Sequence, residues 1–390
     1  MACYISSNDN RFYVATESSY GAVATIAAKN RFPAVKLSAI HRREQPERRD
    51  KTGGRTWVGV PTGFRKRTSF EAVTFLTGWT NQNEEPAYGP LISASLGGSA
   101  KFFTGGTVST MVDPTRMRFT TNHGLSVGQA VTYGGEMRFV TAIVDTVTVV
   151  LNARFTASPA AGAAIGKTVT YAPATELPSV SIFDYWSPQG AVNRILRGSA
   201  VGAMRVGING DFHQFSFRGM AADLLDTESF TSGQGALTAF PAEPAVGALN
   251  YTLVPGNLGQ AWLGSTPEQL FTITSGELVV DNDLDLRSRE FGSDTPRCIA
   301  AGTRSVIADF SLFETTEDAT QSLYAAARQR SPVSVMLQLG QDSGQLCGVY
   351  LKSLVPEVPE FLDEETRLEW RFRDSRAQGT IDDEVFLAFG

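Results

Sequence analysis

The sequence predicts a mainly β protein made of two β-rich units of similar plan, each with one short helix, together with a small inserted all-β domain. Three observations lead to this fold class. Strand-and-turn patterns from one part of the chain return in weaker form further along. The chain is rich in Gly, Phe and Thr and has few long helical periods. Its 390 residues are also enough for two or three separate cores.

The repeat is clearest in two pairs of segments. "PSVSIFDYWSPQGA" (178–191) and "SPVSVMLQLGQDSGQ" (331–345) are both β-branched alternating runs that reach a polar turn containing Gly, which is typical of a hairpin arm. "FHQFSFRGMA" (212–221) and "RLEWRFRDSRA" (367–377) both alternate aromatic and polar residues and place an Arg after the last aromatic. This alternation predicts strands with one buried and one wetted face.

Upstream segments continue the parallel more weakly. "FRKRTSFEAVTFLTG" (64–78) corresponds in order to "TRSVIADFSLFETT" (303–316), and a long polar loop precedes each, at 41–55 and 287–302. The order of elements therefore predicts a duplicated plan. Two unrelated β domains in tandem are the alternative.

A short helix is expected in each unit, at 89–98 and at 316–329. The second has the stronger pattern, because Thr315 and Asp318 have the spacing of a capping box. One apolar stripe follows on this helix, formed by Ala319, Leu323 and Ala326.

Two segments interrupt the duplicated plan. Residues 106–172 contain short alternating runs at 117–122, 130–135, 137–144 and 147–153, and they predict a small inserted all-β domain whose removal should leave the rest of the fold intact. Residues 226–268 are rich in Gly, Ala and Pro and predict a linker. The first unit is then 1–105 continued at 173–225, and the second is 269–390.

Composition limits the function. The net charge of −6 argues against a general nucleic-acid binder. Three widely spaced cysteines favour reduced thiols, and the absence of a long apolar run or a signal pattern favours a cytosolic origin without a membrane.

A search for catalytic or binding motifs predicts no enzyme, no metal and no cofactor. "GAAIGKT" (162–168) resembles a phosphate-binding loop, but the first required Gly is replaced by Ala161 and a strand follows instead of a helix. "DNDLD" (281–285) has the alternating carboxylates of a calcium loop without its Gly and Glu. The three histidines, His41, His123 and His213, are isolated.

Charge is separated along the chain. A solvated surface is the ordinary explanation, but a monomer polarised in this way can also stack head to tail. We expect contacts between a basic loop, namely Arg42, Arg43, Arg48, Arg49, Lys51 and Arg55, and an acidic segment, namely Glu357, Glu360, Asp363, Glu364 and Glu365. The run "ELVVDNDLD" (277–285) predicts one strand whose wetted face carries Glu277, Asp281, Asp283 and Asp285.

The order of long polar loop, strand, short helix and a strand run ending in "DFHQFSFRG", with its second version ending in "RLEWRFRD", resembles the tail tube (major tail) proteins of long-tailed bacteriophages. The opening "YVATESSYGAVA" (13–24) is also similar to that family. The resemblance covers most of the chain outside 106–172 and the linker, and it depends on element order without a diagnostic short motif.

The resemblance implies two β-sandwich units, assembled into rings whose inner sheets join into a barrel and whose stacks form the conduit for DNA ejection. Six such folds make a ring in that family, so this chain should form a homotrimeric, pseudo-hexameric ring. The implied partners are other copies of the chain, the tape measure protein, the tail tip and terminator proteins, and passing DNA without specific binding. The implied location is the virion tail, with assembly in the host cytoplasm. Glu277, Asp281, Asp283 and Asp285 are then expected to face the lumen.

Two other functions fit the same sequence. A carbohydrate- or receptor-binding tail or surface protein is the main alternative, because its aromatic side chains can form sugar platforms: Trp57, Trp79, Trp186 and Trp262. The tube of a contractile tail or of a type VI secretion machine is a near neighbour in fold.

Overall fold

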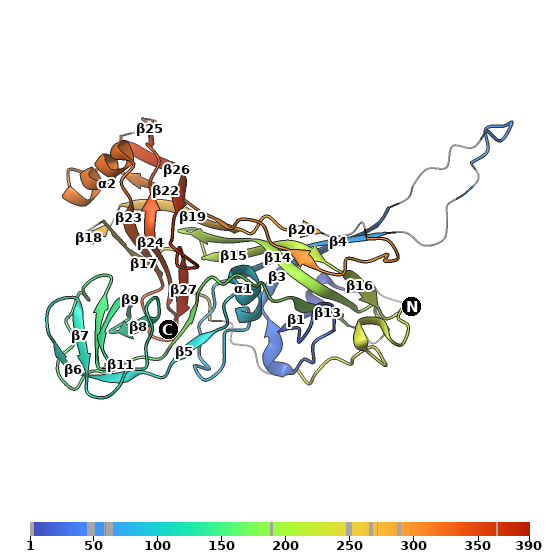
Figure 1. The fold of residues 1–390 in the computed structure, drawn as a ribbon, viewed down its shortest axis with the longest axis horizontal. Coiled ribbons are helices and arrows are strands. Elements are labelled where there is room, and N and C mark those ends of the chain that lie inside the picture. The colour runs from blue at the N-terminus through green and yellow to red at the C-terminus, as the bar shows by residue number, and fades with distance from the viewer. Residues whose placement is uncertain are drawn as a thin grey trace.

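The computed structural model describes residues 4–44, 51–57, 59, 65–187, 190–246, 252–264, 268–270, 272–286, 290–363 and 366–390. This part of the chain is mainly β, with two α-helices and three short 3-10 turns at Ser7–Asp9, Ala28–Asn30 and Gln234–Ala236. The predicted mainly β fold class is therefore confirmed. Figure 1 shows an elongated molecule in which the second half stands at a steep angle to the first.

The first half contains eight strands that meet around helix α1, Gly89–Leu96. Their pairings run β2–β1–β13–β14 on one side and β3–β4–β15–β14 on the other, with β16 beside β14. The strands are β1 Asn10–Thr16, β2 Arg31–Phe32, β3 Ala34–Arg43, β4 Lys66–Phe75, β13 Val180–Trp186, β14 Arg194–Ile208, β15 Gln214–Ala221 and β16 Asp223–Asp226.

The second half repeats these pairings around helix α2, Asp318–Gln329. They run β18–β17–β23–β24 and β19–β22–β26, with β24 and β25 both beside β26. The strands are β17 Gly259–Leu263, β18 Glu268–Leu270, β19 Ile273–Asp281, β22 Ser305–Phe313, β23 Val333–Leu339, β24 Cys347–Val355, β25 Glu360–Leu362 and β26 Glu369–Ala377. A two-stranded ribbon, β20 Asp285–Leu286 with β21 Ile299–Ala300, lies between β19 and β22.

Irregularities in the register indicate that the two halves correspond strand by strand, although the shift between Ala308 and Phe310 in β22–β26 has no counterpart in β4–β15. The β3–β4 ladder shifts between Ala34 and Lys36, and the β19–β22 ladder shifts between Ile273 and Ser275. The β13–β14 ladder shifts after Val180, and the β23–β24 ladder shifts after Val333. A bulge shifts the register and so changes the sheet face on which the following side chains lie. Bulges at matching positions therefore indicate that both halves have the same arrangement of strands.

Three further strands connect the halves to a separate sheet. β5 (Lys101–Phe103), β12 (Thr168–Tyr171) and β27 (Phe386–Phe389) extend the main sheet from β24. A six-stranded sheet, here called the module, has its own apolar cluster and lies at the lower left of Figure 1. Its strands are β6 Gly106–Met111, β7 Arg116–Phe119, β8 Ala130–Tyr133, β9 Glu136–Asp145, β10 Thr148–Leu151 and β11 Ala164–Ile165. The predicted inserted segment thus includes β12, a strand of the main sheet.

The predicted linker is also partly structured. Residues 259–263 form β17, which pairs along its length with β23, so the linker interpretation is wrong there. Before it, Tyr185 donates a hydrogen bond to the carbonyl of Pro241, and Leu237 and Phe240 pack on the cluster of Tyr13 and Phe183. A segment rich in Gly and Pro lies against the first half here because its few apolar side chains find buried partners.

The helices differ in environment. All eight residues of α1 are buried, whereas α2 buries mainly one face, which includes Leu323 and Ala326. The predicted stripe is confirmed, with Ala319 partly buried. The capping box is wrong, because Glu317 is the N-cap without a side-chain cap bond and Thr315 bonds to Thr320 instead.

The two halves share one continuous sheet. Residues 203–208 of β14 pair antiparallel with residues 276–281 of β19, which joins the order β3–β4–β15–β14 to β19–β22–β26. We call this pairing the internal junction. One face of the joined sheet packs into the main core with Phe70, Phe217, Val206, Leu278 and Phe310. The other face is open to solvent along much of its length.

Candidate assembly surface

Two strands of the joined sheet have a free side. Within the described part of the chain, β3 pairs only with β4 and β25 pairs only with β26. A strand with unpaired N–H and C=O groups is a template for pairing with another strand. These two edges are the ends of the sheet that the internal junction holds together in its middle.

Apolar side chains are exposed at both edges. Val35 and Ile40 on β3 are 56% and 48% exposed, and Val358 and Phe361 beside and on β25 are 46% and 54% exposed. Phe361 is already oriented by stacking on Trp370, with ring centroids 5.5 Å apart. Exposed apolar residues along an open strand edge mark it as a surface that another chain can cover.

The predicted basic residues lie on the β3–β4 hairpin and its extension. Arg42 and Arg43 end β3 and are exposed, and Lys51 and Arg55 are exposed as well. Figure 1 shows the segment 51–57 (blue) far from the body, at the opposite end of the molecule from β25. Arg48 and Arg49 lie outside the described residues.

The predicted acidic residues flank β25. Glu357 pairs with Arg330 at 3.6 Å and Glu360 pairs with Arg373 at 3.4 Å, both on the surface, and Asp363 is exposed. Glu364 and Glu365 lie outside the described residues. The described members of the two groups therefore do not meet within one chain, so a contact between these residues has to join two copies.

The carboxylates expected on one strand face are only partly arranged as predicted. Glu277 and Asp281 are on the solvent face of β19, opposite the buried Leu278 and Val280. The strand ends at Asp281, and Asp283 adopts a left-handed conformation with φ of 44°. Asp285 begins β20, so the prediction of a single strand is wrong beyond Asp281. All three aspartates are exposed.

Cross-strand ion pairs cover the open face of the joined sheet. Arg218 contacts Glu71 at 2.7 Å, and Arg205 contacts Glu277 at 3.1 Å across the internal junction. Glu277 is also opposite Asp309 in the β19–β22 register. The solvent face of the joined sheet therefore carries charges of both signs, and Glu277 is one member of an ion pair.

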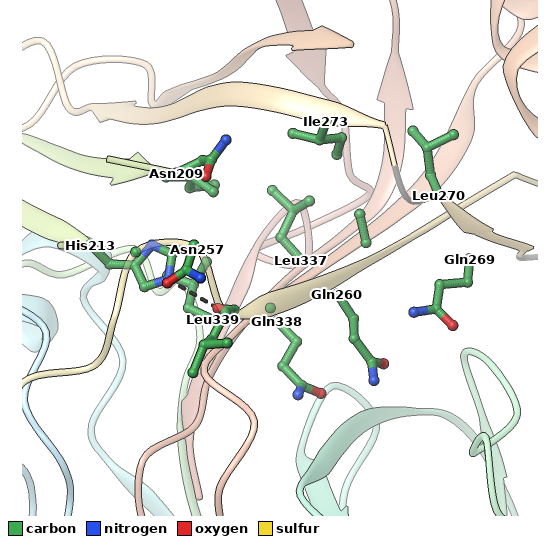
Figure 2. Close-up of a pocket in the computed structure, with 15 residues that line it drawn as sticks. Asn209, His213, Asn257, Gln260, Gln269, Leu270, Ile273, Leu337, Gln338 and Leu339 are labelled. Atoms are coloured by element: carbon green, nitrogen blue, oxygen red, sulfur yellow. Dashed lines mark hydrogen bonds between the residues drawn. The ribbon is translucent and has the colours of Figure 1, made fainter. Parts of the chain in front are cut away.

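A hollow of about 170 Å³ lies beside the internal junction. Figure 2 shows Asn209 and His213 approaching it from the first half, and Gln260, Gln269 and Leu270 from the second. The His213 Nε2 lies 3.2 Å from the carbonyl of Leu258, and the Asn209 amide donates to the carbonyl of Thr274. The turn between β14 and β15 thus covers the hollow and fixes the two halves together.

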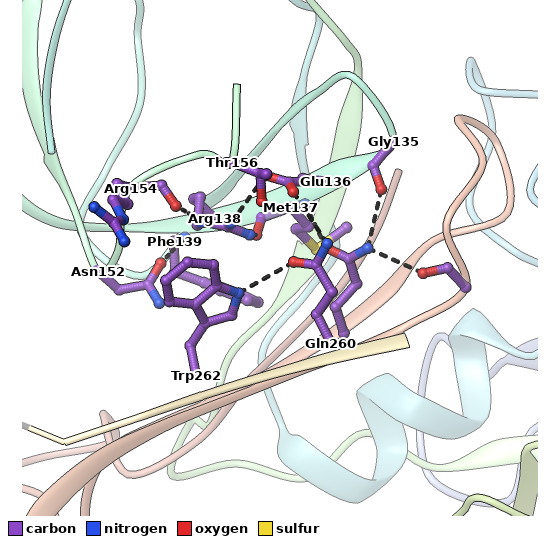
Figure 3. Close-up of polar contacts among 12 residues, drawn as sticks. Gly135, Glu136, Met137, Arg138, Phe139, Asn152, Arg154, Thr156, Gln260 and Trp262 are labelled. Carbon is purple, nitrogen blue, oxygen red and sulfur yellow. Dashed lines mark hydrogen bonds and ion pairs between the residues drawn. The ribbon is translucent and has the colours of Figure 1, made fainter. Parts of the chain in front are cut away.

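The module is attached to the second half by a buried polar network (Figure 3). Arg138 is fully buried, contacts Glu136 at 2.9 Å, and donates to the carbonyls of Arg154 and Met137. Its guanidinium lies 4.6 Å from the ring of Trp262, and Gln260 donates to Glu136 at 3.0 Å. Burial lowers the pKa of Arg138 to about 10, which leaves the side chain charged at neutral pH.

Apolar contacts surround this network. Met137 and Phe139 of the module share a cluster with Met336, Tyr350 and Phe386 of the main body. A Cβ on Gly348 would lie 2.4 Å from the Met137 sulfur, so a small residue is needed for this close approach. Removing the module would expose these side chains, which argues against the expectation that it is dispensable for the fold.

No catalytic arrangement emerges from the described residues. They contain no cluster of three or more His, Cys, Asp or Glu side chains arranged to hold a metal ion. Residues 164–165 and 168–171, in and after the phosphate-loop resemblance, form strands. Trp79 and Trp262 are buried and only Trp57, at 65%, is highly exposed, so the described tryptophans do not form a common sugar platform. Neither described helix has the length and apolar character that crossing a bilayer requires.

Sequence reasoning missed the residues that define the junctions. Phe361 and Val358 resemble ordinary core residues of a strand, and Arg138 resembles a solvent-facing residue. Comparisons with known proteins add nothing to these assignments: no protein-family model matches the chain, and no curated protein matches it.

Proposed function

We propose that this protein is a structural virion protein that polymerises into stacked rings, forming the tail tube through which phage DNA is ejected. One observation carries the proposal. The chain joins its own two halves edge to edge at the internal junction, and the corresponding edges, β25 and β3, have no further strand partner among the described residues. The resemblance in element order to tail tube proteins supplies the biological setting.

The correspondence between the halves defines how two copies would meet. Gly207 pairs with Gln214, and Leu362 pairs with Glu369 at the matching place, so β25 corresponds to the end of β14. The matching bulges make β3 correspond to β19. The internal pair Gly207–Glu277 then translates into a pair between Leu362 of one copy and Ser38 of the next.

Joining the edges in this register removes an energetic liability. It pairs free backbone groups of β3 and β25 and covers Ile40 and Phe361. Burying side chains of this size contributes about 1.5–3 kcal/mol each relative to full exposure, and less for half-exposed ones. Because the two edges differ, the contact is head to tail and closes into a ring when the rotation allows. Three copies would supply six units.

Free strand edges favour a protein that assembles with other copies over an enzyme. The joined sheet would present its open face, with the paired charges, to the interior of the ring, where DNA passes without specific binding. Tape measure, tail tip and terminator proteins are the expected partners at the tube ends, and the virion tail is the expected location. The exposed arm of residues 51–57 would extend toward a neighbouring ring.

Disulfide trapping tests the head-to-tail edge contact. Ser38→Cys and Leu362→Cys are introduced separately, in a chain carrying Cys3→Ser and Cys298→Ser. Each single variant alone should give no crosslinked species under mild oxidation, whereas their mixture should give a covalent dimer and the double variant a ladder ending in a closed ring. Pairing Ser126→Cys of the exposed module surface with Leu362→Cys is the matched control.

Electron microscopy of the wild-type protein provides the second measurement. Rings or tubes are expected at high protein concentration. A monodisperse monomer at every concentration and salt, together with no crosslink in the mixture, would overturn the proposed function.

A further inference from the structure

A buried asparagine at the internal junction joins the second half of the chain to helix α1. Asn282 follows β19 directly and is only 2% exposed. Its side-chain amide donates to the carbonyl of Ser95, in the last turn of α1, and to the carbonyl of Val201. Its backbone N–H donates to the carbonyl of Gly202 at 2.8 Å. One residue thus satisfies a carbonyl at a helix end and continues the pairing of β14 with β19.

The end of helix α2 offers the same kind of carbonyl. The N–H groups of the C-cap residue Arg330 and of Ser331 bond to carbonyls of the preceding turn. Arg328 precedes this C-cap by two residues, as Ser95 does in α1. The helix cannot satisfy the carbonyl of Arg328, because Pro332, four residues later, has no N–H to donate. Residues 328–330 are exposed, so a donor from another chain can approach this helix end.

The strand registers identify the residues that would meet there in the head-to-tail contact. Two pairs with the same separation in sequence match β14 to β24 and β25: Ser199 with Leu354, and Gly207 with Leu362. Between these pairs, Gly202 matches Glu357. The registers of β3 and β19, counted from their matching bulges, place Arg43 where Asn282 stands.

Charge distinguishes the contact between copies from the internal one. Helix α2 lies beside β25, where Tyr324 packs on Phe361 (Figure 1). The Glu357 carboxylate contacts Arg330, the C-cap of α2, at 3.6 Å. Both matching positions of the internal junction are neutral, whereas Arg43 and Glu357 are charged and exposed. The C-terminal end of a helix also favours a cation, so carboxylate and helix together favour an arginine.

We propose that Arg43 of one copy binds between Glu357 and the C-terminus of α2 in a second copy of this chain. This inference rests on the proposed function and adds to it the residues that select the partner edge. The backbone N–H of Arg43 takes the place of the Asn282 N–H. Its guanidinium carries five donors, enough for the carbonyl of Arg328 and for the Glu357 carboxylate together.

The charged pair answers a problem that a duplicated protein creates. Because β3 matches β19 in register, the β3 edge of one chain is able to replace β19 on β14 of another. In that wrong pairing, Arg43 would enter the buried site of Asn282 and meet Gly202, which has no carboxylate. Burying a cation without a partner is costly, so the wrong pairing is disfavoured. Charge complementarity of this kind fixes register and partner more than it raises affinity.

Charge reversal at each side tests the inference. Arg43→Glu and Glu357→Arg should each raise the protein concentration needed for ring assembly by roughly tenfold or more, since like charges are brought together. The double variant should recover most of the loss. Arg43→Asn, which copies the residue at position 282, removes the charge without reversing it and should have a smaller effect. Arg154→Glu, at an exposed arginine of the module, is the control and should have none.

Light scattering after size-exclusion chromatography measures ring assembly, and negative-stain micrographs measure the length of ring stacks. Thermal unfolding of each variant, at a concentration below assembly, establishes that a change in assembly does not come from loss of fold.

The outcomes separate this inference from the proposed function. Wild-type rings together with unchanged assembly of both single variants, or a double variant no better than either, would overturn the inference and leave ring formation standing. Normal rings that stack into shorter tubes would also overturn it, because Arg43 would then act between rings. A wild-type protein that never assembles would overturn both.

Discussion

Replacing Arg138 by methionine should destabilise the protein by about 3–5 kcal/mol, the usual cost of removing one partner from a buried ion pair. Arg138 is fully buried, and methionine keeps most of its apolar volume while it removes all three hydrogen bonds. Glu136 is left with Thr156 and Gln260 as its partners. Two carbonyls also lose a donor.

The charge of Glu136 determines how much of the stability lost with Arg138 a second substitution can recover. Burial raises the pKa of Glu136, but hydrogen bonds from Thr156 and Gln260 and the charge of Arg138 outweigh it, so the net pKa lies below its usual value. Without Arg138 that carboxylate becomes an uncompensated buried charge. Adding Glu136→Gln removes the charge and should recover most of the loss, because deleting both members of a buried pair is often nearly neutral.

Urea unfolding followed by tryptophan fluorescence measures the effect, since Trp262 packs on the guanidinium. Limited proteolysis of the module reports whether it detaches first. Arg154→Met, at an exposed arginine of the same module, is the control and should change stability by less than about 0.5 kcal/mol. A single Arg138 variant within about 1 kcal/mol of wild type, or a double variant no better than the single, would refute the ion pair as the anchor of the module.

Three other measurements follow from the structure. Desolvation lowers the pKa of His213, whose Nδ1 is buried without a partner, so unfolding free energy should fall as pH drops through 6.5, and His213→Gln should flatten that part of the profile. Burial raises the pKa of Cys347, so thiol reagents should label exposed Cys298 in the native protein and Cys347 only after unfolding. Mass spectrometry of peptides measures this labelling, and rapid labelling of Cys347 in the native protein would contradict the prediction. Reversing the charges of Lys51 and Arg55 should leave the proposed rings intact but weaken their stacking, because each exposed pair contributes only about 0.2–1 kcal/mol. The effect should be stronger at low salt, where exposed charges are less screened. Tubes as long as those of the wild type in micrographs would show that the arm makes no contact between rings.

The local elements were predictable because their signals are local. The apolar stripe of Leu323 and Ala326 predicts α2, and the alternating runs at 130–135 and 137–144 predict β8 and β9. The capping box failed because Thr315 found a tertiary partner in Thr320. Local spacing does not reveal such competition.

Long-range pairing accounts for what sequence reasoning missed. Nothing near Gly207 in the sequence indicates that its partner strand is 70 residues away at Glu277. Arg138 is equally hidden, because in an alternating strand an arginine normally marks the wet face. Its partners come from the module and from Trp262, more than 100 residues later. Function at an edge or junction is therefore harder to predict than the strands that make it.

The paired charges of the open face determine how the proposed conduit would interact with DNA. Net negative charge alone would repel phosphates, but the described face offers pairs of opposite sign, Arg218 with Glu71 and Arg205 with Glu277. Fields of such pairs largely cancel beyond a Debye length of about 8 Å at physiological salt. Tight binding to DNA needs several unpaired protein cations, which neutralise phosphates and release the counterions condensed on the DNA. Here, in contrast, each of these arginines already has a carboxylate within 3.1 Å. If this face lines the proposed tube, it would offer passing DNA little to bind, because each phosphate would have to displace a carboxylate from its arginine.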